Sequence, residues 1–171
     1  MNVYLIGYMG VGKTTIGKRL SRRLEYAYCD LDAQIELETK SSISALFAEK
    51  GEAAFRKIES EVLSNIPNNG TVISTGGGAP CHNDNLDFML KAGIVVWLKM
   101  SPEMIVSRLL PGKAKRPLIA KLKDDELLDF VKAHLRKREP TYSRADISLD
   151  VNNMDSKKMD DLAHIVSIYS K

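Results

Sequence analysis

Residues 4–20 read YLIGYMGVGKTTIGKRL, and this stretch decides the fold. The apolar run Val3–Ile6 has the character of a buried strand, and residues 15–24 carry apolar side chains at helical spacing. The glycine-rich turn between them fits the pattern G-x-x-x-x-G-K-[ST], in which backbone N–H groups and a lysine surround phosphates. Strand, loop and helix in this order predict a site for a nucleoside triphosphate.

Each part of this loop has an expected task. Lys13 supplies a mobile cation, and the hydroxyl of Thr14 is expected to bind Mg²⁺ directly. The helix that follows adds the positive end of its dipole. The nucleotide-binding residues expected in this segment are Gly10, Val11, Gly12, Lys13, Thr14 and Thr15.

Length and composition exclude several classes of protein. A chain of 171 residues predicts one domain over 1–171, and its formal net charge of +3 is too small to indicate nucleic acid or membrane as a partner. No apolar run approaches the roughly 20 residues of a membrane span. Cys29 and Cys81 form no C-x-x-C pair, which indicates a reduced, cytoplasmic setting. We expect a monomer.

Strand-like and helical segments alternate along the rest of the chain. The expected strands are 3–6, 27–31, 71–74, 94–98 and 146–151, and the expected helices are 14–24, 43–66, 86–92, 102–110, 124–138 and 157–169. This alternation predicts an α/β fold, with a parallel sheet that is covered by helices on both faces. Ligands of such sheets bind beyond the carboxyl ends of the strands, so residues just after each strand are the candidates for chemistry.

Two acidic residues follow the second expected strand. Asp30 and Asp32 are two residues apart, so they point the same way in an extended chain. One of them could orient Mg²⁺ through water, and the other could accept a proton from an attacking hydroxyl. The strand 94–98 is followed by no acid, so Asp30 is the better candidate for the metal. An alternative is that Asp32 only caps the following helix.

Arginine and glycine supply the next candidates. Arg56 lies at i+4 from Glu52 and at i−3 from Glu59, a spacing that also suits ordinary surface ion pairs. Three glycines at 76–78 follow the third expected strand and leave the backbone bare. Either a ligand approaches this backbone closely or the chain makes a tight turn there.

Basic residues gather in two later segments. The stretch 110–123, LPGKAKRPLIAKLK, has five basic residues and two prolines and lacks helical periodicity. A segment of this kind in a compact domain is usually functional or disordered, although a solvated basic loop is the simpler alternative. Arg136, Lys137 and Arg138 precede Pro140, where we expect the helix to stop, and cations in a last turn also suit the helix dipole.

Taken together, these motifs resemble the shikimate kinase family, which belongs to the nucleoside monophosphate kinase-like P-loop proteins. The resemblance covers nearly the whole chain in order: G-Y-M-G-V-G-K-T-T, D-L-D at 30–32, F-R-x-x-E at 55–59, G-G-G at 76–78, R-P-L at 116–118 and K-R-x-P-x-Y at 137–142. It implies a five-stranded parallel sheet in the order 2-3-1-4-5, a substrate-binding helical region at about 32–62 and a lid at about 110–123. The implied reaction is transfer of the γ-phosphoryl group of ATP to the 3-hydroxyl of shikimate.

The resemblance also implies a role for each matching residue. The implied catalytic residues are Lys13, Asp32 and Arg116, and Arg108 and Arg116 join the P-loop residues in binding ATP. The implied shikimate-binding residues are Asp32, Arg56, Gly77, Gly78 and Arg138, and Mg²⁺ is held by Thr14 directly and by Asp30 through water.

Two other functions compete with this interpretation. One is a kinase for a different small acceptor, such as gluconate or a nucleoside monophosphate. The other is a nucleotide-dependent switch without turnover, but the D-x-x-G and N-K-x-D motifs of GTPases do not occur in the sequence.

Overall fold

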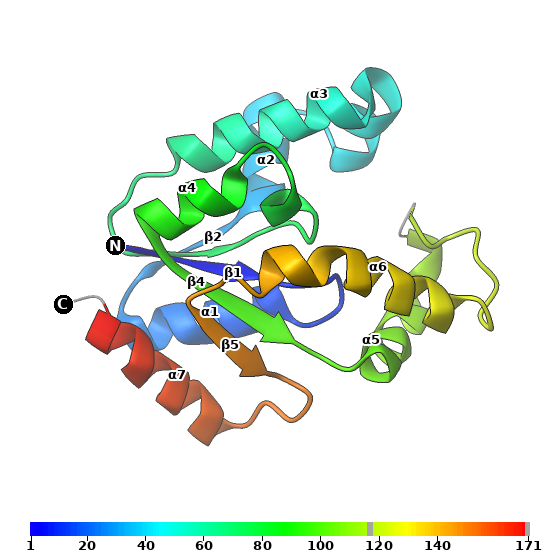
Figure 1. Cartoon of the computed structure of the whole chain (residues 1–171). Helices are drawn as coiled ribbons and strands as arrows, with labels where there is room; N and C mark the ends of the chain where they lie inside the picture. The colour runs from blue at the N-terminus through cyan, green and yellow to red at the C-terminus, as the bar shows by residue number, and fades with distance from the viewer. Residues whose placement is uncertain (116–117, 170–171) are drawn as a thin grey trace.

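A computed structural model describes residues 1–115 and 118–169. It contains a five-stranded sheet made of β1 (Asn2–Ile6), β2 (Ala27–Asp30), β3 (Thr71–Ser74), β4 (Gly93–Lys99) and β5 (Ile147–Asp150) (Figure 1). The strand order is β2-β3-β1-β4-β5, and all neighbouring strands are parallel. The predicted fold class and strand order are therefore confirmed.

Helices cover both faces of this sheet. They are α1 (Lys13–Leu24), α2 (Leu31–Thr39), α3 (Ile43–Asn65), α4 (Asn85–Ala92), α5 (Pro102–Leu109), α6 (Leu127–Tyr142) and α7 (Ser156–Tyr169), with short 3₁₀ helices η1 (Ala79–Cys81) and η2 (Leu110–Lys115). The buried side chains of α1, α5 and α7 pack on one face, and those of α2, α3 and α4 pack on the other. Among the described residues, no helix is long and apolar enough to span a membrane.

The central strand β1 shows why the sequence pattern is a continuous apolar run. Val3 and Leu5 belong to the core under α1, α5 and α7, whereas Tyr4 and Ile6 belong to the opposite core. All five residues of β1 are buried. A strand that is buried on both faces has apolar side chains on both sides, which removes the alternation typical of a half-exposed strand. The one polar residue of β1, Asn2, is hydrogen-bonded through its side chain to Pro67 and Thr71.

Three sequence expectations need correction. Residues 31–39 form α2, which the apolar pattern did not reveal. Helix α6 continues through Pro140 to Tyr142, where a stop was expected. Proline removes one N–H donor and its ring crowds the carbonyl group four residues earlier. The last turn is nevertheless retained, and the Ser143 N–H donates to the Glu139 carbonyl at 2.8 Å. Within 110–123, residues 110–115 form η2 although helical periodicity is missing.

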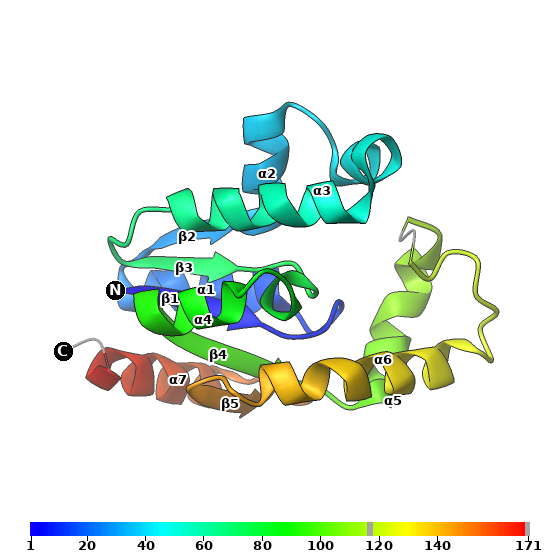
Figure 2. The same ribbon diagram turned by 45° about the horizontal axis from the view of Figure 1, so that its top comes forward.

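The segments with candidate functional residues lie at the carboxyl ends of the strands. In Figure 2 the strand arrowheads point toward the side of the molecule on which α5 lies. Helices α2 and α3 lie above the sheet in the same view. The loop after β1 leads into α1, and the loop after β3 contains the three glycines. Gly51 breaks α3 with a positive φ of 76°, so residues from Glu52 onward form a separate helical stretch.

Candidate active site

The loop after β1 has the conformation of a phosphate-binding loop. Gly7, Gly10 and Gly12 have φ values of 139°, 85° and 97°, a region that residues with a Cβ rarely adopt. At Gly7 space is also lacking, because a Cβ would lie 2.6 Å from the carbonyl oxygen of Leu98. Both constraints explain why the motif requires glycine.

Lys13 folds back over this loop. Its Nζ donates to the carbonyl oxygens of Gly7 at 2.7 Å and Tyr8 at 2.9 Å. Burial lowers the pKa of Lys13 to about 8, and the nearby carboxylate of Asp32 offsets part of this effect. The ammonium group therefore lies beside the loop, where it could exchange carbonyl oxygens for phosphate oxygens.

A cleft of about 450 Å³ joins this loop to the next two strand ends. Its lining includes Gly10, Gly12, Lys13, Thr14, Asp30, Asp32, Gly76, Gly77 and Arg108. Arg108 reaches the loop from α5, and its Nη1 donates to the carbonyl oxygen of Val11 at 3.3 Å. The cleft thus brings the phosphate-binding loop together with Asp32 and Gly77. Five other predicted residues among those described do not line it: Val11, Thr15, Arg56, Gly78 and Arg138.

Thr14 and Asp30 form a compact pair of oxygen ligands. The Thr14 hydroxyl donates to Oδ2 of Asp30 at 3.1 Å, and the Tyr28 hydroxyl donates to the same oxygen at 3.3 Å. Asp30 is also the N-cap residue of α2, because Oδ1 accepts the N–H of Ala33. The alternative that Asp32 caps this helix is therefore wrong. A hydroxyl beside a carboxylate suits Mg²⁺, which binds few protein oxygens and keeps several waters.

Asp32 lies one residue inside α2 and faces the glycine loop after β3. A Cβ on Gly76 would lie 3.1 Å from Oδ1 of Asp32 and 3.0 Å from Oε1 of Glu59. Partial loss of solvent raises the pKa of Asp32, and the charge of Asp30 raises it further. These surroundings favour a carboxylate that can take up a proton more readily than an ordinary aspartate.

Arg56 is held at both ends of its guanidinium group. Nη1 contacts Oε2 of Glu59 at 2.8 Å, and Nη2 contacts Oε1 of Glu52 at 3.2 Å. The side chain of Glu59 is 1% exposed and that of Glu52 is 62% exposed. Glu59 is thus a fixed support, whereas Glu52 is a partner that a ligand could displace. The Nε of Arg56 is buried and has no hydrogen-bond partner among the described residues.

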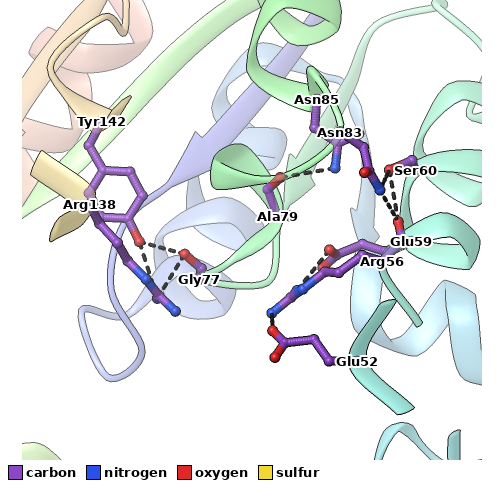
Figure 3. Close-up of polar contacts among 10 residues, drawn as sticks. All are labelled: Glu52, Arg56, Glu59, Ser60, Gly77, Ala79, Asn83, Asn85, Arg138 and Tyr142. Carbon is purple, nitrogen blue, oxygen red and sulfur yellow. Dashed lines mark hydrogen bonds and ion pairs between the residues drawn. The ribbon is translucent and has the colours of Figure 1, made fainter. Parts of the chain in front are cut away.

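Arg138 approaches the same glycine loop from α6. Its Nη1 donates to the carbonyl oxygen of Gly77 at 3.0 Å, and the Tyr142 hydroxyl donates to that oxygen at 2.5 Å. A Cβ on Gly77 would lie 3.2 Å from Nη1 of Arg138, and a Cβ on Gly78 would lie 2.6 Å from Nη2 of Arg56. Figure 3 shows the two arginines on either side of the loop that carries Gly77 and Ala79.

Sequence reasoning missed part of this arrangement. Glu59 was treated as one of two ordinary ion-pair partners, but its burial makes it a structural support for Arg56. Tyr142 entered only as the last residue of the K-R-x-P-x-Y motif and was given no role, although its i+4 spacing from Arg138 places both on one side of a helix. Thr15 is exposed in the first turn of α1. Arg116 lies outside the described residues, so its role stays a prediction.

The chain is similar to known proteins over almost all its length. The family model described as shikimate kinase matches residues 9–168. The shikimate kinase of Bacteroides fragilis is 45% identical over 146 residues, which cover 85% of this chain and 82% of that protein. The shikimate kinase of Bacteroides thetaiotaomicron is 40% identical over 158 residues, which cover 92% and 90%.

Solved structures show the same relationship. A crystal structure of shikimate kinase from Bacteroides thetaiotaomicron superposes with a TM-score of 0.88 and 37% identity, covering 99% of this chain and 98% of that one. Shikimate kinase from Acinetobacter baumannii, solved in complex with shikimate, has a TM-score of 0.81 and 32% identity, covering 99% and 93%. The matched strand order, the phosphate-binding loop and this similarity over nearly the full length lead to one assignment: the chain belongs to the shikimate kinase family.

Proposed function

We propose that this protein transfers the γ-phosphoryl group of ATP to the 3-hydroxyl of shikimate, giving shikimate 3-phosphate and ADP for aromatic amino-acid biosynthesis. The observation that carries the proposal is the placement of Arg56 and Arg138 at consecutive glycines, Gly78 and Gly77, beside the phosphate-binding loop. An acceptor that carries a carboxylate and several hydroxyls fits this arrangement. The Acinetobacter baumannii relative, which binds shikimate, supports this choice of acceptor.

The two arginines would hold the carboxylate of shikimate. Guanidinium groups form planar, paired hydrogen bonds to carboxylates, and such charge-assisted bonds are stronger than neutral ones. Glu59 keeps Arg56 in place from behind, while the exposed Glu52 would give up its contact to the substrate. Without a Cβ, Gly77 and Gly78 leave room for both guanidinium groups and for contacts between substrate and backbone.

Asp32 would act on the hydroxyls of shikimate. It lies between Lys13 and the glycine loop, and both its partial desolvation and the charge of Asp30 raise its pKa. In this position its carboxylate can orient the 3-hydroxyl and accept the proton that the hydroxyl loses when it attacks phosphorus. Because phosphoryl transfer demands mainly positioning and charge neutralisation, one carboxylate that accepts the proton is sufficient at the shikimate hydroxyl.

The nucleotide would lie along the phosphate-binding loop. Backbone N–H groups at residues 10–15 would face the phosphates, Lys13 would contact their outer oxygens, and Arg108 would approach from α5. Mg²⁺, when bound, neutralises charge on the phosphates. Thr14 would hold it directly and Asp30 through water, and their 3.1 Å contact suits a shared ion. We assign substrate binding to about 32–62 and a lid carrying Arg116 to about 110–123.

A direct assay tests the proposal. ADP release is measured with ATP and Mg²⁺, with and without shikimate, and then with gluconate and nucleoside monophosphates as acceptors. We expect release that depends on shikimate, and phosphorus NMR that places the new phosphate on the 3-hydroxyl. Equal release without an acceptor, or a clear preference for another acceptor, would contradict the proposal.

A further inference from the structure

Tyr8 is a buried residue of the phosphate-binding loop whose side chain belongs to the other half of the site. The residue is 1% exposed, and its ring lies against His134 of α6. The loop motif leaves this position open, so the pattern of glycines and lysine does not explain a tyrosine there.

Two residues of α6, one helical turn apart, hold the Tyr8 ring. The Tyr8 hydroxyl lies 3.0 Å from Nδ1 of His134, and the two rings meet edge to face with centroids 5.5 Å apart. The guanidinium carbon of Arg138 lies 5.5 Å from the centre of the Tyr8 ring. His134 and Arg138 are separated by four residues, so they share one face of α6.

This face of α6 is a row of contacts at four-residue intervals. Phe130 packs edge to face on His134 at 5.4 Å between centroids, and Tyr142 bonds to the Gly77 carbonyl that Arg138 also contacts. Phe130 and Tyr142 therefore hold the two ends of this row in place. Arg138 therefore lies between the Tyr8 ring and the glycine loop, with Tyr8 itself fixed by His134.

The protonation of the pair supports a hydrogen bond with a defined direction. Burial lowers the pKa of His134 to about 4, and the charge of Arg138 lowers it too. Burial raises the pKa of Tyr8 to about 12. Both side chains are thus neutral near pH 7, and we assign the proton of His134 to Nε2, so that the Tyr8 hydroxyl donates to Nδ1.

We propose that His134 is a positioning residue for the substrate: it fixes the ring of Tyr8, and that ring keeps the guanidinium group of Arg138 directed at the glycine loop. The inference rests on the proposed function, because it assumes that Arg138 holds the carboxylate of shikimate. A cation over an aromatic face is attracted to it, and a ring that cannot rotate limits where that cation settles. His134 needs no contact with either substrate for this effect.

Matched variants of the full chain test the proposal. His134→Leu removes the acceptor, whereas His134→Asn keeps an oxygen at the position of Nδ1. We expect His134→Leu to raise the KM for shikimate about fivefold, the value of one neutral hydrogen bond. His134→Asn should stay within about twofold of the parent, and the KM for ATP and kcat should stay within about twofold in both variants.

Tyr8→Phe supplies an independent variant, because it removes only the hydroxyl and keeps the ring that faces Arg138. It should raise the KM for shikimate as much as His134→Leu does, and the double variant should add nothing further. Equal losses in the Leu and Asn variants, additive losses in the double variant, or an equal rise in the KM for ATP would overturn the proposal. Failure of the parent itself to use shikimate would refute the proposed function instead, so the two failures are distinguishable.

Discussion

Replacing Gly78 with alanine separates substrate binding from folding unusually well. Gly78 has φ −91° and ψ −22°, a right-handed region that alanine adopts without strain. The three heavy atoms nearest to an added Cβ all belong to the end of Arg56, with Nη2 at 2.6 Å and Cζ and Nη1 at 3.0 Å. Nη2 is at the far end of the Arg56 side chain and its partner Glu52 is exposed, so Nη2 can move away while Nη1 keeps its contact with Glu59, and the fold should survive.

The size of the movement sets the expected loss. Nη2 must retreat by about 0.8 Å to go from 2.6 Å to the 3.4 Å at which ordinary van der Waals contact begins. A hydrogen bond from Nη2 of Arg56 to the carboxylate of shikimate has a usual length of about 2.8 Å. Lengthened by about 0.8 Å, it reaches about 3.6 Å, which is no longer a hydrogen bond. Losing one such bond to a charged group costs about 1.5–3 kcal/mol, so the KM for shikimate should rise about 10- to 150-fold.

A coupled assay of ADP release measures this KM, and thermal unfolding checks that stability is retained. The control is the same substitution in an Arg56→Ala background, where no guanidinium group remains to be displaced. There, Gly78→Ala should have no further effect on the KM for shikimate. A large further loss in that background, or an unchanged KM in the single variant, would refute the reasoning, since the added methyl group would then act through something other than Arg56.

Three other predictions concern residues of the same cleft. The pKa of Lys13 is lowered to about 8, so above that pH the free protein must take up a proton when ADP binds. The affinity for ADP, measured by calorimetry, should then fall about tenfold per pH unit above pH 8 in the parent. It should not fall in Lys13→Arg, which stays charged, and an equal fall with pH in both proteins would contradict this prediction. Asp32→Asn should lower kcat about 100-fold or more in steady-state assays while changing the KM for shikimate far less; an effect on KM alone would remove its role in proton transfer. Arg56→Lys keeps the charge but loses the planar fork, and should raise the KM for shikimate about 10- to 150-fold without changing the KM for ATP; a variant that matches the parent would remove Arg56 from substrate binding.

Sequence patterns predicted the sheet well because β1, β3 and β4 are mostly apolar and buried, and β1 and β3 end at recognisable glycine-rich loops. They predicted α2 poorly. Only Leu31 and Ile35 of this helix are buried, while Leu37 is 72% exposed, so apolar residues do not follow the period of one helical face. Asp30, rather than Asp32, caps α2, because the helix starts one residue after β2 ends and leaves no separate connecting segment.

Candidate residues of the site could be named from the sequence, but the supports of their charged groups could not. Residue types and spacings singled out Lys13 and the pair Asp30 and Asp32, whereas the family resemblance singled out Arg56 and Arg138. The spacing of Arg56 and Glu59 is equally compatible with a solvated ion pair, and burial alone distinguishes the two cases. Burial depends on the packing of α3 against the loop after β3, a contact between segments that are distant in the sequence and that no local pattern encodes.

The cations around the phosphate-binding loop and the glycine loop after β3 are paired with acceptors that belong to the protein. Lys13 contacts the carbonyl oxygens of its loop, Arg138 contacts that of Gly77, and Arg56 contacts Glu59 and Glu52. Removing a fully hydrated cation from water when a ligand binds would cost several kcal/mol. These cations already lost most of their water when the chain folded, so ligand binding does not carry this cost. In the proposed reaction, phosphate and carboxylate oxygens would replace these acceptors, of which Glu52 is the most exposed. Binding energy is therefore available for alignment of the reacting groups, which is what phosphoryl transfer requires most from a protein.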